Sequence, residues 1–254
     1  MTSIQAVPVV ASWQEPQGIA PRGTVIVVPG RGEHALVYER FGRRIATDGY
    51  RVEAVSAPTV DEARTERQIR ALLESAPSAE VGETGPQPRV LVGSDTGALF
   101  AAGLVADGMP GVAGLVLAGL PTAAAGRVLS WEDELQARTA CPTHQNRLSA
   151  DPALYRGAFA ARVPSGWFAR ARPDQLGVPV LGLHGAGDTI SPLADARSWY
   201  SDVPKAELVG IAGGRHDALN DQTHRSAAAT VVLFLEQLRL GADVPTLARR
   251  EVLR

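Results

Sequence analysis

The sequence predicts an α/β fold, with a mostly parallel sheet flanked by helices and a helical cap insertion. Short apolar runs alternate with amphipathic stretches along most of the chain, as expected of strands that are joined by covering helices. One long block in the second half lacks this alternation. A third signal is the junction at 93–97, where two glycines enclose three polar residues between an apolar run and a helical pattern.

The apolar runs are short and rich in Val, Leu and Ile, as is typical of strands that are buried on both faces of a parallel sheet. We expect strands at 24–28, 51–55, 89–93, 112–118, 178–184 and 205–211. Between them, apolar residues recur at helical spacing. We expect helices at 38–47, 61–74, 96–106, 193–200 and 223–240.

The block 121–176 has no strand pattern and contains several large aromatic residues. We expect it to be a helical cap inserted into a core that is formed by 1–120 and 177–254. A chain of 254 residues is long enough for one such domain. We interpret 75–88, rich in Pro, Gly and Glu, as a loop, and we assign no role to the tail 241–254.

Composition excludes several function classes. The formal net charge is -2 and the isoelectric point is near 6.2, so there is no basic surface to attract nucleic acid. The single cysteine, Cys141, permits no internal disulfide. No run approaches the roughly 20 apolar residues of a membrane span, and the first residues do not resemble a signal peptide. We therefore expect a cytoplasmic protein that acts on a small-molecule or peptide substrate.

The most informative segment is Gly93-Ser94-Asp95-Thr96-Gly97, which follows an apolar strand and precedes a helix. A strand that runs into Gly-x-nucleophile-x-Gly and then a helix is the pattern of a nucleophile elbow. Here the central position is Asp95. Ser94 lies one place early, where its side chain would point away from the exposed tip, so we do not interpret it as the nucleophile. The alternative is an ordinary loop with helix-capping residues.

Two later segments supply the partners that an elbow needs, in the order nucleophile, acid, histidine. Asp188 follows the strand 178–184, and His216 lies on a loop after the strand 205–211. The carboxyl ends of parallel strands lie at one edge of a sheet, so the three side chains are expected to meet there. The coincidence of all three at matching positions favours a site over three unrelated loops.

With these motifs the chain resembles the α/β-hydrolase superfamily over nearly its whole length. It is most similar to the monoglyceride-lipase and lysophospholipase-like branch, through the runs 29–34 (PGRGEH) and 213–217 (GGRHD). The resemblance implies that Asp95 occupies the nucleophile position, Asp188 the acid and His216 the base. It also implies an oxyanion hole formed by the amides of Thr96 and Arg31.

Other residues are candidates to line the substrate pocket. These are Gly30, His34, Trp131, Tyr155 and Trp167. Arg31, Arg215 and several cap arginines are further candidates to bind a carboxylate-bearing substrate, although most of them are individually more typical of a solvated surface. The cap arginines are Arg127, Arg138, Arg147, Arg156 and Arg162.

An aspartate at the nucleophile position makes this an atypical member, because the usual residue there is serine. A carboxylate that attacked an ester carbonyl would form a reactive anhydride, so simple ester hydrolysis is disfavoured. Attack on a saturated carbon leaves an alkyl ester that His216-activated water can cleave. Haloalkane dehalogenases and epoxide hydrolases of the superfamily work in this way. The dehalogenases have an indole at the position of Thr96. The epoxide hydrolases have two tyrosines in the cap, whereas the cap expected here has Tyr155 alone.

A second possibility is proton transfer next to a carbonyl that is held in the oxyanion hole, which would make an epimerase or isomerase. Atypical superfamily members without the serine exist, among them the bottromycin peptide epimerase of natural product biosynthesis. A third is a degenerate fold that only binds a ligand. We expect no metal site, because the histidines have no ligand spacing, and no nucleotide cofactor, because no Gly-x-Gly-x-x-Gly follows a strand.

Overall fold

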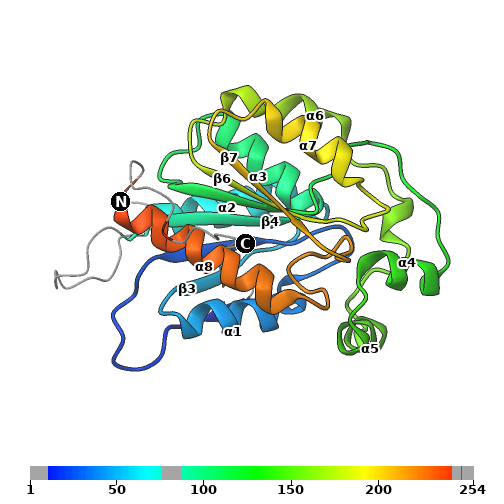
Figure 1. The fold of residues 1–254 in the computed structure, drawn as a ribbon, viewed down its shortest axis with the longest axis horizontal. Coiled ribbons are helices and arrows are strands. Elements are labelled where there is room, and N and C mark those ends of the chain that lie inside the picture. Colours follow the sequence, from blue (N-terminus) through cyan, green and yellow to red (C-terminus); the bar gives the residue numbers. More distant parts are fainter. Residues whose placement is uncertain (1–10, 76–86, 242–246, 248–254) are drawn as a thin grey trace, which may run out of the picture.

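The computed structural model describes residues 11–75, 87–241 and 247. Most of the loop at 75–88 and of the tail at 241–254 lies outside these residues. A seven-stranded sheet in the order β1-β3-β2-β4-β5-β6-β7 runs through the centre of the molecule (Figure 1). The strands are β1 (Ala11–Trp13), β2 (Thr24–Val28), β3 (Arg51–Ala54), β4 (Arg89–Ser94), β5 (Gly114–Ala118), β6 (Val180–Gly185) and β7 (Ala206–Ile211).

Neighbouring strands are parallel except at one edge, where β1 pairs with β3 in antiparallel register. The six expected strands are confirmed, each to within two residues at either end. The seventh, β1, was not expected, because its three residues are too few to show an alternating pattern. Its Trp13 packs so closely on α1 that a Cβ at Gly42 would lie 2.2 Å from the indole ring.

The helices of the core are those that the sequence predicts. They are α1 (Glu39–Thr47), α2 (Glu62–Glu74), α3 (Thr96–Ala106), α7 (Leu193–Ser201) and α8 (His224–Leu240). The segment 121–176, all of which is described, contains helices and no strand. Its elements are α4 (Trp131–Arg138), α5 (Pro142–Ala150), α6 (Ser165–Arg170) and the short 3-10 helices η2 (Ala158–Ala160) and η3 (Pro173–Gln175).

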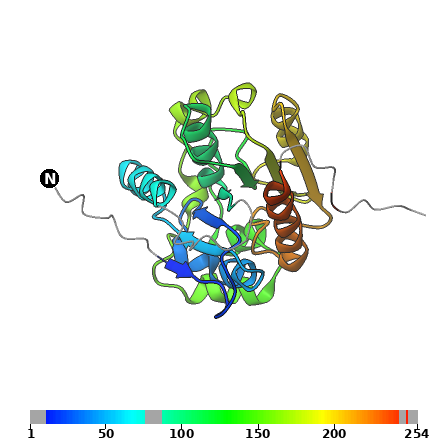
Figure 2. The ribbon, with the colours of Figure 1, turned by 90° about the vertical axis from the view of Figure 1, so that its left-hand side faces the viewer.

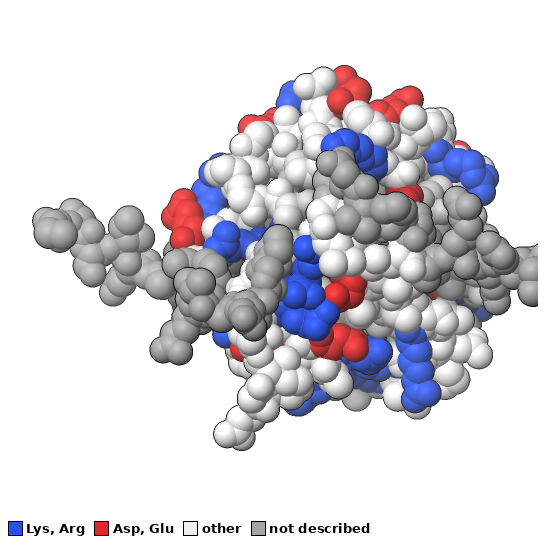
Figure 3. Space-filling model, turned by 60° about the vertical axis from the view of Figure 1, so that its left-hand side comes forward, with Lys and Arg blue, Asp and Glu red and all other residues white. Residues whose placement is uncertain are grey.

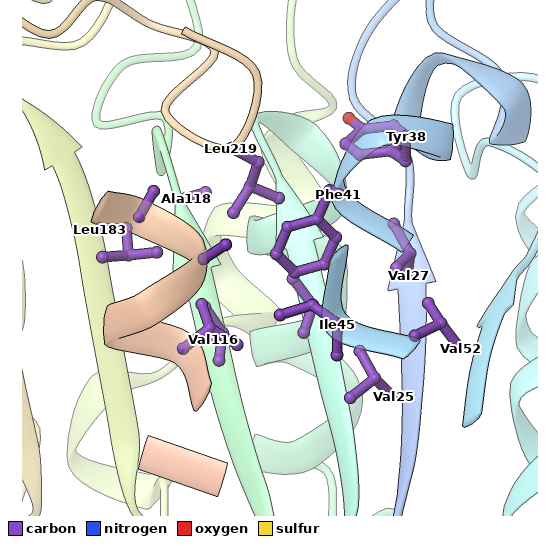
Figure 4. Packing of buried hydrophobic residues seen from close by; sticks show 14 of the residues in the cluster. Val25, Val27, Tyr38, Phe41, Ile45, Val52, Val116, Ala118, Leu183 and Leu219 are labelled. Atoms are coloured by element: carbon purple, nitrogen blue, oxygen red, sulfur yellow. The ribbon is translucent and has the colours of Figure 1, made fainter. Parts of the chain in front are cut away.

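Helices cover both faces of the sheet (Figures 1 and 2). Alternate residues of β2 belong to two separate cores, with Val25 and Val27 on the side of α1 and α8 and Ile26 and Val28 on the side of α2, α3 and α7. Figure 4 shows the first core, where the side chains of α1 and α8 lie against the sheet. Burial on both faces explains why the strands are continuously apolar instead of alternating.

The segment 121–176, called the cap below, contacts the loops at the carboxyl edge of the sheet. The Tyr155 amide donates to the Gly32 carbonyl, 2.9 Å away, and the Asp217 amide donates to the Arg138 carbonyl at 2.8 Å. These bonds join the cap to the loops that follow β2 and β7. At its far end the cap is held by Trp167, whose ring lies 5.2 Å from that of Phe100 in α3. The cap therefore covers the edge where the expected site residues lie.

Acidic and basic side chains lie next to one another on the face shown in Figure 3, without a large area of one sign. Within the described residues, no helix combines the length and the apolar character that crossing a membrane requires.

Replacing Gly97 with Ala tests how tightly α3 packs on β2. A Cβ at Gly97 would lie 2.2 Å from the Val28 carbonyl oxygen, which is backbone and cannot move aside easily. We expect the free energy of unfolding in urea to fall by about 1–3 kcal/mol. Gly166→Ala is the control, because nothing lies within 4 Å of its Cβ. Equal effects of the two substitutions would contradict this packing.

Candidate active site

Asp95 lies at a sharp turn between β4 and α3. Its φ is 47° and its ψ is -124°, and it is the one non-glycine residue with positive φ in the described part of the chain. Its amide donates to the Ala118 carbonyl at 2.9 Å. A Cβ at Gly93 would lie 2.5 Å from the Ala98 amide nitrogen, so the turn leaves no room for a side chain there. This strained backbone places a buried carboxylate at the carboxyl edge of the sheet.

The side chains of Asp95, His216 and Asp188, which the sequence places at one edge of the sheet, lie in a row; these three residues are called the row below. His216 Nε2 is 3.2 Å from Asp95 Oδ1, and His216 Nδ1 is 2.8 Å from Asp188 Oδ2. The other oxygen of Asp188 accepts hydrogen bonds from the amides of Ile190 and Ser191, at 2.8 and 2.9 Å. Asp188 is thus fixed by its own loop, and it orients His216 toward Asp95.

Arg31, on the loop after β2, occupies the remaining donor positions around the Asp95 carboxylate. Its backbone amide donates to Oδ2 at 2.9 Å, and its role in an oxyanion hole stays a prediction. Its guanidinium adds two more bonds, Nε to Oδ2 at 2.8 Å and Nη2 to Oδ1 at 2.9 Å. Both oxygens of Asp95 are therefore occupied, in a two-pronged ion pair with side chains that are only 6% and 2% exposed.

The ion pairs determine the charge states of the row. Burial acts to raise the pKa of Asp95, but Arg31 and His216 outweigh it and hold that pKa well below its usual range. Burial likewise opposes ionisation of His216, yet Asp188 and Asp95 raise its pKa to about 10. The pKa of Asp188 is lowered, against the effect of burial, chiefly by His216. At neutral pH an imidazolium thus lies between two carboxylates.

Phe159 of the cap closes the site from above. The centre of its ring lies 5.0 Å from the Arg31 guanidinium and 4.2 Å from that of Arg138. The ring of His216 meets it edge to face at 5.1 Å. Sequence reasoning did not assign Phe159 to the site, because a contact between a cap turn and the sheet edge leaves no periodic signal.

A second buried cluster of charges adjoins the first. Arg138 of α4, fully buried, donates to Glu134 and to the Arg31 carbonyl, each at 2.9 Å. Its Nη1 lies 3.5 Å from Glu33 and 3.6 Å from Asp217. Burial, with the nearby Asp217 carboxylate, raises the pKa of Glu33 to about 8. Arg138 therefore links the cap to the loop that carries Arg31.

The structure resembles solved structures that share one fold. A soluble variant of monoglyceride lipase from Saccharomyces cerevisiae has a TM-score of 0.72 and 16% identity, covering 90% of this chain and 91% of that one. A monoacylglycerol lipase from Paleococcus ferrophilus has a TM-score of 0.69 and 19% identity, with 90% and 98% covered. The protein has the α/β-hydrolase fold.

A thioesterase domain from the curacin biosynthetic pathway has the same fold, with a TM-score of 0.57, 18% identity and coverage of 89% and 93%. No family model matches the chain. The comparisons thus confirm the α/β-hydrolase fold that was expected from the sequence. At such low identities they carry neither the activity nor the substrate of these enzymes to this chain.

One of the candidate pocket residues, Gly30, lies near the row. A Cβ at Gly30 would be 2.9 Å from that of Asp95, so only glycine permits the loop after β2 to approach so closely. His34 instead faces the cap, where its Nε2 lies 2.8 Å from Asp151 Oδ2. Thr96 begins α3, and its Oγ1 is buried without a hydrogen-bond partner among the described residues.

The three aromatic candidates contact other parts of the molecule. The ring of Trp131 lies 5.0 Å from the Arg156 guanidinium, and Tyr155 is 69% exposed. Trp167 packs on Phe100, and its indole donates to Glu62 at 3.0 Å. The contacts described for these residues do not include the row. A place for them in substrate binding stays a prediction.

Within the described residues, no group of three His, Cys, Asp or Glu side chains is arranged to hold a metal ion. Cys141 is a free, buried thiol. The site itself brings together a carboxylate, an imidazolium and the amide and guanidinium of Arg31.

The charge states predict how stability depends on pH. His216 loses its proton near pH 6.5 in the unfolded chain and near 10 in the folded one, so its stabilising contribution is complete below 6.5 and lost as pH rises through 10. Glu33, raised from 4.5 to about 8, loses its contribution as pH rises through 8. We expect the free energy of unfolding to fall steadily from pH 6.5 to 10.

Urea unfolding at a series of pH values measures this slope. In His216→Asn we expect the fall between pH 8 and 10 to disappear, whereas in Glu33→Gln only the part below pH 8 should be reduced. A slope between pH 8 and 10 that is unchanged in His216→Asn would contradict the assigned imidazolium.

A double-mutant cycle measures the Arg31 ion pair. Arg31→Met leaves the buried Asp95 carboxylate without its main partner, so we expect a loss of about 3–5 kcal/mol in the free energy of unfolding. Combined with Asp95→Asn, the loss should be at least ~1 kcal/mol smaller than the sum of the two single losses. Arg197→Met is the control, since Arg197 is exposed; strictly additive losses would show that the pair is not coupled.

Proposed function

We propose that this protein is a hydrolase that attacks a saturated carbon of a small or peptidic metabolite with the Asp95 carboxylate and needs no cofactor. One observation carries the proposal. Asp95 Oδ2 rests on the Arg31 amide, 2.9 Å away, while Oδ1 faces His216 Nε2 at 3.2 Å. Oδ2 would thus become the carbonyl oxygen of the ester, held by the Arg31 amide. Oδ1 would be the oxygen that attacks the substrate, next to the His216 imidazole that would later activate water.

In the first step a bond forms between Asp95 Oδ1 and the substrate carbon, and the leaving group departs with the electron pair of the broken bond. The product is an alkyl ester of Asp95. Its carbonyl oxygen, Oδ2, remains on the Arg31 amide, which can stabilise the negative charge that develops there when water attacks.

The second step depends on a change in His216. In the free protein, both Asp188 and Asp95 raise the pKa of His216, so it holds a proton and cannot act as a base. Esterification removes the charge of Asp95 and leaves Asp188 alone. The pKa of His216 then falls, and its proton passes to the leaving group or to solvent water. The neutral imidazole can then take a proton from the water that attacks the ester carbonyl carbon and give it to the departing alkoxide. Hydrolysis restores the carboxylate and releases the alcohol.

The fold relatives include lipases and a thioesterase, but the ester chemistry of these relatives would produce an anhydride with Asp95. We therefore place the substrate outside simple esters. A cytoplasmic location and a role in natural product biosynthesis are further parts of this proposal.

A second candidate function is proton transfer, as in an epimerase or isomerase. The observation that favours it is the pairing of an imidazolium with a carboxylate 3.2 Å away, which are a proton donor and an acceptor on one side of a substrate. A fold that only binds a ligand is the third candidate, supported by the occupied oxygens of Asp95.

Substitutions separate the nucleophile from its neighbour in the sequence. In assays with a panel of small epoxides and alkyl halides, Asp95→Ala and His216→Gln should each lower turnover by roughly 10³-fold or more. Ser94→Ala should leave it within about threefold, since Ser94 ends β4 and is buried. The reverse pattern would place the nucleophile at Ser94.

Isotope labelling separates the three functions. After turnover in ¹⁸O-labelled water, mass spectrometry of the peptide that contains Asp95 should show one heavy oxygen, because water attacks the ester carbonyl carbon. Proton transfer would leave Asp95 unlabelled and place one deuterium on the substrate in heavy water. Binding with neither label would leave ligand binding as the function.

A further inference from the structure

All four donors around Asp95 are in place, and neither carboxylate oxygen is open to an incoming carbon. Two of the donors are held firmly, since the Arg31 amide is part of the backbone and His216 is fixed by Asp188 at 2.8 Å. The Arg31 guanidinium is the third partner and the one that lies on a flexible side chain. Attack by Asp95 therefore requires this guanidinium to move away.

The guanidinium lies just beneath the surface. Its outer nitrogen, Nη1, donates to the Ala161 carbonyl at 3.4 Å, which is a long hydrogen bond, and Ala161 is exposed. The ring of Phe159 forms its other contact, with 5.0 Å to the ring centre. A short outward movement past Ala161 would bring the guanidinium to solvent and open the space above Asp95.

A neutral substrate offers the guanidinium no new partner, so the cost of separating it from the buried Asp95 carboxylate is not offset. A substrate carboxylate could take the place of Asp95 as the partner of the Arg31 guanidinium, since it accepts the same two parallel hydrogen bonds. Asp95 would meanwhile keep its contact with the His216 imidazolium. An incoming carboxylate thus exchanges one ion pair for another.

The cap arginines divide into two groups that support this exchange. Arg138 and Arg147 are neutralised, by Glu134 at 2.9 Å and Glu39 at 2.6 Å. The other three lie on two cap segments, 122–130 and 155–163, that hydrogen-bond to each other and contain no Asp or Glu. These arginines are exposed and have no ion pair within the described residues; they are Arg127, Arg156 and Arg162.

The segment 155–163 also contains Phe159 and Ala161, the two cap residues that contact the Arg31 side chain. The Arg127 and Arg156 guanidinium groups donate to the Thr189 and Ser149 carbonyls. Together with Arg162 they add positive charge to the two segments that include Phe159 and Ala161, and positive charge there favours the approach of an anion. We infer that the Arg31 guanidinium blocks access to Asp95 in the free protein. We infer also that the substrate carries a carboxylate, which binds this guanidinium and displaces it from Asp95. This inference rests on the proposed function, because it concerns access to the same nucleophile.

Two epoxides of equal size test it, glycidate with a carboxylate and glycidamide with a carboxamide on the same oxirane. When Asp95 Oδ1 bonds to an oxirane carbon, the carbon–oxygen bond opens and the oxirane oxygen takes a proton from water. In His216→Gln the ester should accumulate, and mass spectrometry of the Asp95 peptide measures it. We expect glycidate to react at least about tenfold faster than glycidamide, and Arg31→Met in the same background to abolish or reverse this preference.

Binding is measured separately, with propionate and propionamide as unreactive probes at equal ionic strength. Propionate should raise the melting temperature of the unsubstituted protein by about 3–6 °C near ten times its Kd, and propionamide should not. The rise should persist in Arg197→Met, the control at an exposed arginine, and vanish in Arg31→Met.

The outcomes distinguish the two proposals. Glycidamide reacting as fast as glycidate, while Arg31 is present, would overturn the displacement by a carboxylate and leave the nucleophile intact. Propionate binding through Arg31 without any ester on Asp95 would support the displacement and refute the nucleophile. Neither ester nor binding, with or without Arg31, would refute both.

Discussion

The backbone at Asp95 is the constraint on which the site depends. A positive φ at a residue with a side chain costs on the order of 1–3 kcal/mol and persists only where the surroundings impose it. Here they do, because the turn from β4 into α3 is closed by glycines that cannot carry a Cβ on either side. The strain directs the Asp95 carboxylate into the space between Arg31 and His216, where two opposite charges stabilise it.

Much of this could be predicted from the sequence. Six strands and the five core helices follow from apolar patterning, and Asp95, Asp188 and His216 could be brought together because each follows a parallel strand. Apolar patterning is a local property, and the position of a residue directly after a strand follows from the topology of the sheet. Both can be recognised in a sequence. The short strand β1 left none, because an edge strand needs only three residues to pair with β3.

The surroundings of the row could not be predicted in the same way. The sequence indicates Arg31 for its backbone amide and as a possible partner of a substrate carboxylate, whereas in the structure its side chain forms a buried ion pair with Asp95. Arg138 was one of several cap arginines, and nothing in the spacing of Glu134 and Arg138 distinguishes a buried pair from a solvated one. Contacts of this kind form only when the turns of the cap pack against the sheet edge. Packing between segments that are distant in the sequence produces no periodic pattern from which it could be predicted.

The buried charges contribute little net stability, since desolvation offsets most of their attraction. They do fix geometry. Arg138 donates to the Arg31 carbonyl, so the loop that presents the Arg31 amide is held by the cap, and Glu33 of the same loop lies 3.5 Å from Arg138. The helix α4 and the loop after β2 thus form one unit. In the proposed reaction, the Arg31 side chain could therefore move while the Arg31 amide stays in place.

An aspartate at the elbow also changes what its histidine can do. With a neutral residue at that position, Asp188 would be the one carboxylate in contact with His216. With Asp95 there are two, and His216 keeps its proton well above neutral pH. In the proposed hydrolysis, the base needed for the second step would therefore be absent until the charge of Asp95 is removed. Formation of the ester would remove that charge, so the first proposed step would create the base for the second.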